Sequence, residues 1–557
     1  MTERFKDYGT GCRAKLWQLM TAAFLFLFLF AGKAYAYSAA TTINSVTINA
    51  DTKSSIQVSM TSSNRDMTGT DGKIYVFEIK PYQTDLTMRK DPLASADAAD
   101  QMDVSFDLDA GPGEKRLYSS FVAAVKVGSR YQIVSNRCYI TNPEVLAANQ
   151  DAQLNNGKKG LRVDPNLLDD ALSLNIKHAG VDIPTQRFFG SGISYSFEGK
   201  TYQINASLIN QLDQEVKRLS DSGVAVTAIL LNGWNKTVTE LNPVGVSELP
   251  TTQAMYYQFN VETEGGFRAV KAMASYLAKR YNGKNGYGKI TSWVIGNEID
   301  NQYWNYAGDY DVSTYVQKFQ RAFRVFYTAI KSESANDNVM FSIDHYWNMY
   351  PEAAPVGKYK AKDVVEWFNN WDHTEGRIDW GLSLHPYSYP MSKAAFWDDE
   401  ETGLVTQDAN SPVVTFQNLH VITDFMQNES IRNPKGEVRT IFLTEQGFTS
   451  TYQNQKDTSE EQAAAVAYSY YIVENNPYIK AYLLSRQEDS ADETTSGLAF
   501  GLSYFEGSTM IHKQAHEVFK NIDNPSLTLQ TSEFAKAVIG ITDWNQVISG
   551  FKAPGQS

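Results

Sequence analysis

The stretch from Ile290 to Asn301 reads ITSWVIGNEIDN and decides the fold of the chain. Its first half is an apolar, β-branched run that is typical of a buried strand. The run stops at Gly296, and Asn297 and Glu298 follow. In barrels of eight parallel strands, catalytic groups lie where strands end at the C-terminal face. Glu298 is therefore a candidate catalytic carboxyl group, although a glutamate in this position can also cap a helix or lie in a solvated loop.

From Leu167 onwards, apolar strands alternate with long helices of 3.6-residue period, which favours a parallel sheet. The clearest strands are expected at 224–231, 290–295, 339–347, 379–390, 439–448 and 479–489, and the clearest helices at 208–220, 266–281, 315–330, 416–426, 458–473 and 512–522. We place the first strand at Ala171 to Lys177, and the irregular hairpin-like region from Pro184 to Asn205 can hold the missing strand. About eight such units predict a (β/α)₈ barrel.

The segment before the barrel has a different pattern. Between about residues 38 and 145, apolar side chains alternate with period two, as at Val46 and Ile48, and turn clusters such as Asp71-Gly72 separate the runs. This pattern predicts a small all-β sandwich. We therefore divide the chain into residues 1–36, a β-sandwich domain at 37–148 and a barrel domain at 149–557. The sandwich is either a sugar-binding module or a packing and spacer domain.

The first 36 residues are typical of a secretory signal peptide. Basic residues precede an apolar run from Leu19 to Ala31, and Ala34-Tyr35-Ala36 offers a cleavage site. The apolar run is shorter than the roughly 20 residues of a transmembrane helix, so we expect a secreted or cell-surface protein with no integral span after cleavage. An uncleaved anchor is the alternative.

Cysteine use and net charge narrow the class of protein further. Cys12 lies in the signal peptide and Cys138 is then alone, so no disulfide framework is expected and a large core must supply the stability. The absence of disulfides in a secreted protein favours a bacterial source for this chain. The chain carries a net charge of −13, which argues against a nucleic-acid partner.

No catalytic metal or cofactor is expected from the sequence. The seven histidines show no HExxH or similar pair, and there is no phosphate loop, nucleotide fingerprint or Gly-x-Ser-x-Gly elbow. The acidic loop from Glu488 to Glu493 offers oxygen ligands for calcium, but it lacks the EF-hand spacing and a solvated run of charges is the alternative.

A second strand also ends in a glutamate. Glu445 stands in Thr444-Glu445-Gln446-Gly447, His385-Pro386-Tyr387 lies in the strand expected at 379–390, and Lys279-Arg280-Tyr281 ends the helix before Asn297-Glu298. In chain order the four motifs are Lys279-Arg280-Tyr281, Asn297-Glu298, His385-Pro386-Tyr387 and Thr444-Glu445-Gln446-Gly447. In this order, over residues 167–523, they resemble the retaining glycoside hydrolases of clan A. No family within the clan is indicated.

The resemblance implies a role for each matching residue. Glu298 and Glu445 would be the acid/base and the nucleophile at the ends of strands four and seven, and Asn297 would bind the sugar 2-hydroxyl. Tyr387 would donate a hydrogen bond to Glu445, and His385 would donate to the same region. Packing roles at strand ends are the alternatives for His385 and Tyr387.

The chain departs from the clan pattern at two places. The arginine that often holds the nucleophile has only a weak candidate, Arg187. Strand eight, where many members place a tryptophan beneath the sugar, reads Leu484-Ser485-Arg486-Gln487. Among the aromatic residues of the strand-following loops, Trp234 and Trp347 are our candidates for sugar platforms, with packing as the alternative.

The chemistry explains why two carboxyl groups are needed. Cleavage with retention requires a proton donor and a carboxylate nucleophile about 5 to 5.5 Å apart, with opposite protonation states near neutral pH. We therefore predict a secreted retaining glycoside hydrolase that acts on a poly- or oligosaccharide in polysaccharide degradation. A secreted carbohydrate-binding protein on a degenerate barrel is the alternative. An ester or amide hydrolase on the same barrel lacks a candidate nucleophilic Ser or Cys.

Overall fold

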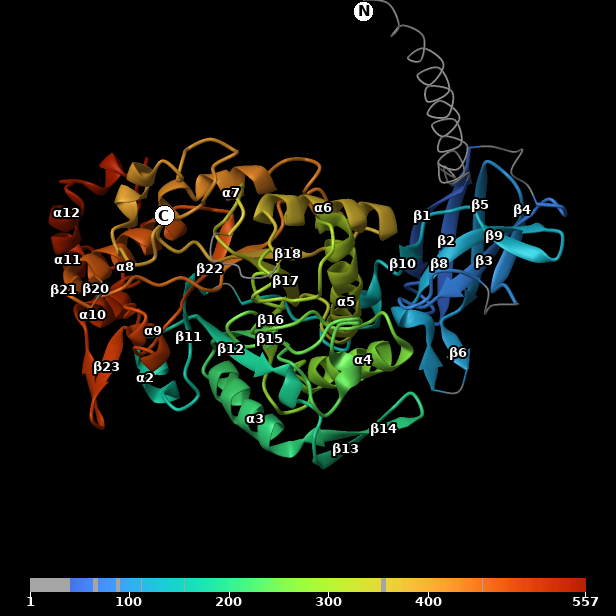
Figure 1. The fold of residues 1–557 in the computed structure, drawn as a ribbon, viewed down its shortest axis with the longest axis horizontal. Coiled ribbons are helices and arrows are strands. Elements are labelled where there is room, and N and C mark those ends of the chain that lie inside the picture. Colours follow the sequence, from blue (N-terminus) through green and yellow to red (C-terminus); the bar gives the residue numbers. More distant parts are fainter. Residues whose placement is uncertain are drawn as a thin grey trace, which may run out of the picture.

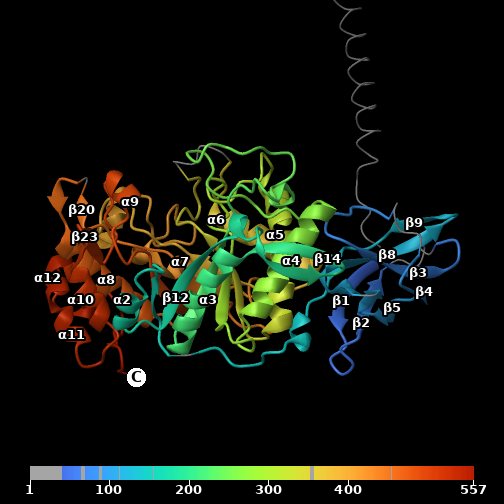
Figure 2. The ribbon, with the colours of Figure 1, turned by 90° about the horizontal axis from the view of Figure 1, so that it is seen from below.

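The computed structural model describes residues 41–63, 69–86, 91–111, 113–154, 156–351, 357–452 and 454–556. The predicted signal peptide, including Cys12, lies outside the described residues. In two perpendicular views the N-terminal sheets and the C-terminal helices lie at opposite ends of the molecule, with the barrel between them (Figures 1 and 2).

Two antiparallel sheets form the N-terminal part, as the period-two pattern predicts. One has the strand order β1-β2-β5 and the other the order β10-β8-β3-β4, with β9 paired to β8. Apolar side chains from both sheets, such as Val46 and Val76, are buried in the same core. The strands are β1 (Thr41–Ile48), β2 (Ser55–Ser62), β3 (Lys73–Ile79), β4 (Ala94–Asp97), β5 (Gln101–Asp107), β8 (Ser120–Val127), β9 (Arg130–Ile133) and β10 (Cys138–Tyr139), with a small hairpin of β6 (Asp109–Gly111) and β7 (Glu114–Lys115).

Eight parallel strands close into a barrel, which confirms the predicted fold class. Their order is β11-β12-β15-β16-β17-β18-β19-β22, and β22 pairs with β11 to close the ring. The strands are β11 (Lys159–Arg162), β12 (His178–Pro184), β15 (Ala225–Leu231), β16 (Ile290–Ile295), β17 (Asn338–Ile343), β18 (Gly381–Leu384), β19 (Ile441–Leu443) and β22 (Ile479–Leu484). The strand that begins at Ile290 is therefore the fourth of the barrel and is followed by Glu298, and Glu445 follows the seventh.

The prediction for the first two strands was wrong. The residues from Leu168 to Ser173 form helix α2, in which Ala171 and the following Leu174 are buried on one side. The true first strand, β11, reads Lys-Gly-Leu-Arg and has no apolar run to mark it. The region from Pro184 to Asn205 forms a hairpin of β13 (Gly192–Phe197) and β14 (Lys200–Asn205) outside the barrel.

Helices cover the outside of the barrel, and they lie at the predicted segments except for α2 and the helix at Ala361–Glu375, which was not predicted. Beyond α2 they are α3 (Ala206–Asp221), α4 (Glu264–Arg280), α5 (Val312–Glu333), α6 (Ala361–Glu375), α7 (His420–Met426), α8 (Ser459–Glu474) and α10 (Gln514–Asn521). After β22 the chain adds α9 (Ala491–Thr495), the hairpin β23 (Ser503–Glu506) and β24 (Thr509–His512), and, beyond α10, helices α11 (Thr528–Thr531) and α12 (Glu533–Ile539). A short hairpin of β20 (Thr451–Tyr452) and β21 (Lys456–Asp457) precedes α8.

A separate apolar cluster fills the barrel itself. It contains Ile229, Val294, Met340, Phe442 and Leu483, one from each of five strands. Alternate residues of the same strands point outward into the main core, as the two-residue period of a strand requires. Because the interior of the barrel is packed, side chains reach an opening only at the ends of the strands. Within the described part of the chain, no helix has both the length and the apolar character needed to cross a membrane.

Candidate active site

The two glutamates lie at the C-terminal ends of their strands and come from separate sides of the barrel. Glu298 follows β16 and has a left-handed backbone conformation, with φ of 39°, which is uncommon for a residue other than glycine. Its N–H donates to Ser342 Oγ of the neighbouring strand β17 at 2.9 Å. Such backbone strain tends to gather at functional sites, where the surrounding structure holds it in place.

The carboxyl groups of Glu298 and Glu445 are close neighbours. One oxygen of each, together with a ring nitrogen of His385, all lie within 4.8 Å of one another. Retaining glycosidases hold their carboxyl groups about 5 to 5.5 Å apart, whereas inverting enzymes need about 6.5 to 9.5 Å to admit a water molecule. The spacing in this structure belongs to the shorter class.

The surroundings of Glu298 favour its protonated form. Its side chain is buried, and burial raises its pKa well above the ordinary value, with the negative charges of Asp344, Glu445 and Asp300 adding to the shift. His385 Nδ1 lies 2.8 Å from Glu298 Oε1. Burial lowers the pKa of His385 to about 4, so the imidazole is neutral near pH 7 and places no positive charge beside Glu298.

The surroundings of Glu445 have the opposite effect. Burial alone would raise its pKa, but the charge of Arg162 and a hydrogen bond from Tyr387 outweigh that effect and lower it below the ordinary value. Tyr387 Oη donates to Glu445 Oε1 at 2.9 Å. Arg162 Nη1 donates to the other oxygen, Oε2, and Arg162 Nη2 is held by both oxygens of Asp182 at 2.7 and 2.6 Å.

Arg162 is the functional residue that the sequence analysis missed. It is the last residue of β11, the strand that was placed incorrectly. Arg187, the weak candidate, is exposed at the end of a 3₁₀ turn (Thr185–Arg187), so the prediction for Arg187 was wrong. Arg162 ends a short polar strand and is followed by Val163 and Asp164. A search for periodic apolar residues does not detect such a strand.

The structure places both His385 and Tyr387 in the site, but each of them contacts a different glutamate. Tyr387 contacts Glu445, as expected, and its hydroxyl oxygen also lies 3.3 Å from Ser485 Oγ, which can donate to it. His385 was expected near the nucleophile, whereas its ring hydrogen-bonds to Glu298 and, through Nε2, to Thr444 Oγ1 at 3.1 Å. The two residues come from the end of the same strand, β18, and each positions a different glutamate.

Two further carboxyl groups lie behind Glu298. Asp300 is fully buried, and burial together with the charge of Asp344 raises its pKa well above the ordinary value. Asp300 Oδ1 accepts a hydrogen bond from the Asp344 N–H at 3.0 Å. Oδ2 of Asp300 has no hydrogen-bond partner among the described residues. A neutral Asp300 avoids placing a third negative charge in this buried group.

The remaining predicted residues differ in how far the structure supports them. Asn297 is buried next to Glu298, and its contact with a sugar stays a prediction. Trp234 is half-buried and packs edge-on against Tyr257 with ring centroids 5.1 Å apart, and its role as a platform also stays a prediction. Trp347 is 1% exposed and packs against Phe425. The expectation for Trp347 was therefore wrong, because no face of its ring is open to a sugar.

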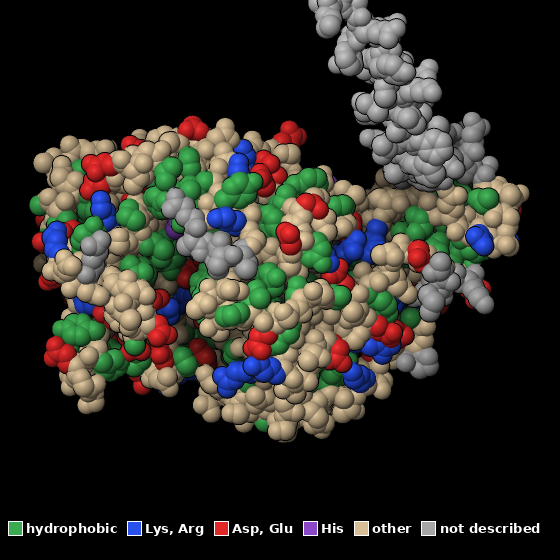
Figure 3. Space-filling model, in the orientation of Figure 1, with side chains coloured by type: hydrophobic (Ala, Val, Ile, Leu, Met, Phe, Trp, Pro, Cys, Tyr) green, Lys and Arg blue, Asp and Glu red, His purple; other side chains and the backbone are tan. Residues whose placement is uncertain are grey.

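A cavity of about 800 Å³ opens beside the glutamates, over the ends of β11, β12, β15 and β22. Arg162 and Ser485, which contact Glu445 and Tyr387, form part of its wall. Figure 3 shows a hollow in this region, left of centre, with basic and acidic side chains along it. Glu215 of α3 also lines the cavity and is 4% exposed; burial, with the charges of Asp182 and Asp164, raises its pKa to about 8.

Charged residues of the acidic loop form one rim of this cavity. Asp489 pairs with Lys513 at 2.7 Å, and Glu493 pairs with Arg486 at 2.5 Å. Lys513 and Arg486 thus already neutralise two of the carboxylates that a calcium ion would need, which favours the alternative of a charged surface loop. Arg486 itself follows strand eight, at the place where the clan pattern has a tryptophan.

Glu298, His385 and Glu445 also have the spacing of a metal-ligand set. The contacts around them oppose a divalent cation. Arg162 and Tyr387 already hold the two oxygens of Glu445, and a guanidinium next to the carboxylate repels a second cation. The arrangement fits proton transfer and nucleophilic attack better than metal binding.

The fold and the site define a (β/α)₈-barrel protein with a pair of neighbouring glutamates at the C-terminal face whose pKa values are shifted in opposite directions. The chain belongs to the family of unknown function DUF5722, whose model matches residues 151–547. The matched region covers the whole barrel and leaves out the N-terminal sheets. The comparison with curated proteins finds no match.

The comparison with solved structures finds glycoside hydrolases among its matches. A family 39 glycoside hydrolase from Bacteroides cellulosilyticus WH2 is 14% identical, with a TM-score of 0.43, over 80% of this chain and 76% of the other. The family 1 β-glucosidase from Thermotoga maritima is 12% identical, with a TM-score of 0.40, over 66% of this chain and 86% of the other. Likeness at this level does not identify a substrate for this chain.

Proposed function

We propose that this protein is a retaining glycoside hydrolase that acts by double displacement, with Glu298 as the acid/base and Glu445 as the nucleophile. The observation that carries the proposal is the separation of their carboxyl oxygens, within 4.8 Å, which suits direct attack on the anomeric carbon. The opposite pKa shifts of the two groups support the same assignment, since such a pair identifies an acid and a base.

In the first step, Glu445 attacks the anomeric carbon while the bond from that carbon to the leaving oxygen breaks. Glu298 gives its proton to the leaving oxygen, so a neutral alcohol departs and a glycosyl ester forms on Glu445. The His385 Nδ1–H tautomer would bind Glu298 Oε1 and leave the proton on Oε2. Arg162 and Tyr387 fix the attacking carboxylate and keep it ionised.

In the second step, water attacks the anomeric carbon of the glycosyl ester. Glu298, now a carboxylate, accepts a proton from this water, and the bond to Glu445 breaks. The sugar leaves with retained configuration, and both glutamates return to their starting protonation states. The same residue acts as acid and then as base, which explains why a group with a raised pKa is needed at this position.

The substrate would be a poly- or oligosaccharide outside the cell. The predicted N-terminal signal peptide supports secretion or cell-surface attachment, and the lack of a disulfide framework favours a bacterial source. The cavity beside the glutamates has the volume of a small-ligand site, and its many charged side chains offer hydrogen bonds to sugar hydroxyl groups. Asn297 would bind the 2-hydroxyl, and Trp234 is the candidate platform for a sugar ring.

Covalent trapping tests this proposal. The protein is exposed to a panel of 2-deoxy-2-fluoro glycosides with good leaving groups, and its intact mass and the modified peptide are measured. We expect one fluoroglycosyl adduct on Glu445 in the parent protein and no adduct in Glu445→Gln. Glu333→Gln, at the far end of α5, is the matched control and should be labelled normally.

The other outcomes are also informative. Labelling of a residue other than Glu445 would overturn the assignment of the nucleophile. Glycan binding by the parent protein without any adduct or any hydrolysis would instead favour the carbohydrate-binding protein on a degenerate barrel.

A further inference from the structure

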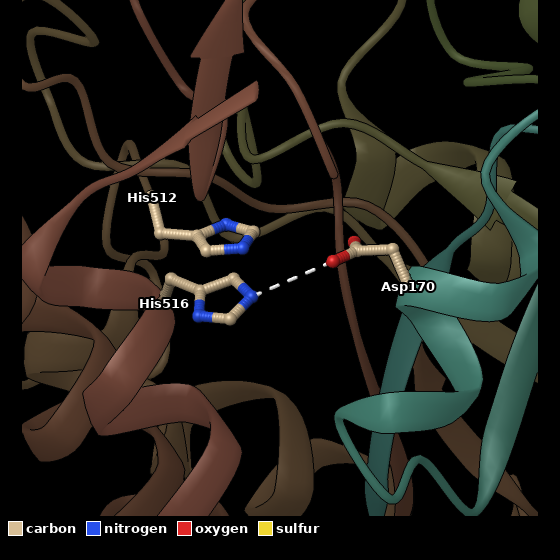
Figure 4. A group of neighbouring side chains, drawn as sticks. All are labelled: Asp170, His512 and His516. Carbon is tan, nitrogen blue, oxygen red and sulfur yellow. Dashed lines mark ion pairs between the residues drawn. The ribbon is translucent and has the colours of Figure 1, made fainter. Parts of the chain in front are cut away.

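A second group of chemically active side chains lies away from the two glutamates. Asp170 comes from α2, His512 ends β24 and His516 lies in α10, and one ligand atom of each is within 4.8 Å of the others. Figure 4 shows the two imidazole rings side by side, with ring nitrogens facing the Asp170 carboxylate. The histidines are four residues apart in His-Lys-Gln-Ala-His. This spacing is not an HExxH motif, because Lys513 stands where that motif has a glutamate.

The buried histidine of this group lacks a hydrogen-bond partner. His516 is 6% exposed, and its Nε2 has no hydrogen bond among the described residues. The nearest opposite charge, Asp170 Oδ1, is 3.7 Å away, which is too far for a hydrogen bond. A buried polar atom without a partner is costly, and it needs an explanation such as an ion. Two atoms that ligate one zinc ion at about 2.0 to 2.1 Å are themselves roughly 3 to 3.5 Å apart.

The surrounding contacts orient the other two groups toward the same point. Ser503 Oγ hydrogen-bonds to His512 Nδ1 at 2.9 Å, so Nε2 of His512 remains available as a ligand. Gln487 Nε2 donates to Asp170 Oδ2 at 2.5 Å, so Oδ1 remains available. Outer contacts of this kind, which fix a ligand's ring or carboxylate, are typical of metal sites. The two imidazole rings are nearly parallel, with centroids 3.7 Å apart and planes at 18°.

We propose that Asp170, His512 and His516 form a site for a divalent transition metal ion of the zinc class. Two imidazoles and one carboxylate suit zinc and, with higher intrinsic affinity, copper or nickel, whereas calcium and magnesium prefer oxygen ligands alone. Because His512 is exposed, a water molecule can complete a tetrahedral set. The ligands need to approach by about 1 Å to reach zinc-binding distances.

The position of this site gives the metal a structural role. Asp170 follows β11, the first barrel strand, and both histidines follow β22, the last one, and β11 pairs with β22 to close the barrel. A metal ion would therefore join segments at the closure of the ring that lie far apart in sequence. Gln487, which holds Asp170, also lines the cavity beside the glutamates. The metal site does not depend on the proposed glycosidase chemistry.

Zinc titration tests the proposal. The full chain, prepared without a polyhistidine tag and freed of metal by a chelator, is titrated with Zn²⁺ against a chromophoric competitor, and its melting temperature is measured with and without Zn²⁺. A ligand that binds only the folded state raises the melting temperature. We expect one bound Zn²⁺ and a higher melting temperature in the parent protein. Both effects should be lost in His512→Ala, an exposed position, and in Asp170→Asn.

Two control variants distinguish this site from others. His420→Ala removes a histidine elsewhere on the surface, and Glu445→Gln disrupts the Glu298, His385 and Glu445 group. Both should keep the bound Zn²⁺ and the rise in melting temperature. The proposal is overturned if the parent protein binds no Zn²⁺, if His512→Ala and Asp170→Asn bind as the parent does, or if only Glu445→Gln loses binding.

Discussion

The hydroxyl group of Tyr387 should set the pH at which Glu445, the proposed nucleophile, becomes active. Tyr387→Phe removes the donor 2.9 Å from Glu445 Oε1 and leaves the ring in place. A hydrogen bond to a charged group contributes about 1.5 to 3 kcal/mol. At about 1.36 kcal/mol for each factor of ten, the ionisation constant of Glu445 should fall roughly 10- to 100-fold. The pKa of Glu445 therefore rises, and activity is lost at a higher pH on the acidic side.

The assay is the pH profile of kcat/KM with an activated aryl glycoside, because this parameter reports the ionisation of the free enzyme. We expect the acidic limb of Tyr387→Phe to move to higher pH, while the basic limb, which reports Glu298, stays in place. Tyr471→Phe is the control, since it removes a buried hydroxyl that bonds Thr528 and Ser532 far from the glutamates. An unmoved acidic limb, or an equal movement in Tyr471→Phe, would refute the role assigned to Tyr387.

Three further predictions follow from the same structure. Arg162→Lys should lower kcat/KM roughly 10- to 100-fold, because lysine cannot reproduce the forked contacts to Glu445 and Asp182; Arg187→Lys should leave it unchanged, and a similar loss in both would contradict this. Asp344→Asn removes a negative charge that raises the pKa of Glu298, so activity should be lost at a lower pH on the basic side, whereas a basic limb that stays in place would contradict the charge effect. Trp347→Ala should lower the free energy of unfolding in urea by about 3 to 5 kcal/mol, and Trp347→Phe should keep the parent KM; a raised KM in Trp347→Phe without loss of stability would restore the sugar-platform role.

The two glutamates could be predicted from the sequence because each follows a strand in which apolar residues predominate. The runs at Ile290–Ile295 and Ile441–Leu443 are fully buried, so their ends mark a face of the barrel even without knowledge of the other strands. The helices were predictable for a similar reason. The buried residues of α3, for example, include Leu208, Leu212 and Leu219 on one face, and such a stripe is visible in the sequence.

The first barrel strand could not be predicted because polar contacts hold it in place. In β11, Lys159 is fully buried and pairs with Asp523, while Arg162 pairs with Glu445 and Asp182. Periodicity detects apolar burial alone, so a strand with charged residues at both ends reads as a loop. The partners of Arg162 are also remote in sequence, and only the closed ring brings them together. Arg162 was missed for this reason.

The burial of Trp347 was equally hidden from the sequence. Like Trp234, it follows a barrel strand, and both positions are compatible with a sugar platform or with packing. Trp347 Nε1 donates to Ala409 O at 3.2 Å and its ring packs on Phe425. Both partners come from the segment between β18 and β19, whose path the local sequence does not reveal.

The order of strands around the barrel explains why two similar carboxyl groups behave differently. From β17 through β22 to β11 the strand ends supply, in order, Asp344, His385 with Tyr387, Glu445, Arg486 and then Arg162. Glu298 on β16 therefore has an aspartate from the adjacent strand, whereas Glu445 on β19 has arginines from the strands on its other side. Negative charge next to one glutamate and positive charge next to the other move their pKa values apart. Because β11 brings Arg162 next to Glu445 only when it pairs with β22, closure of the barrel is itself part of what lowers the pKa of Glu445.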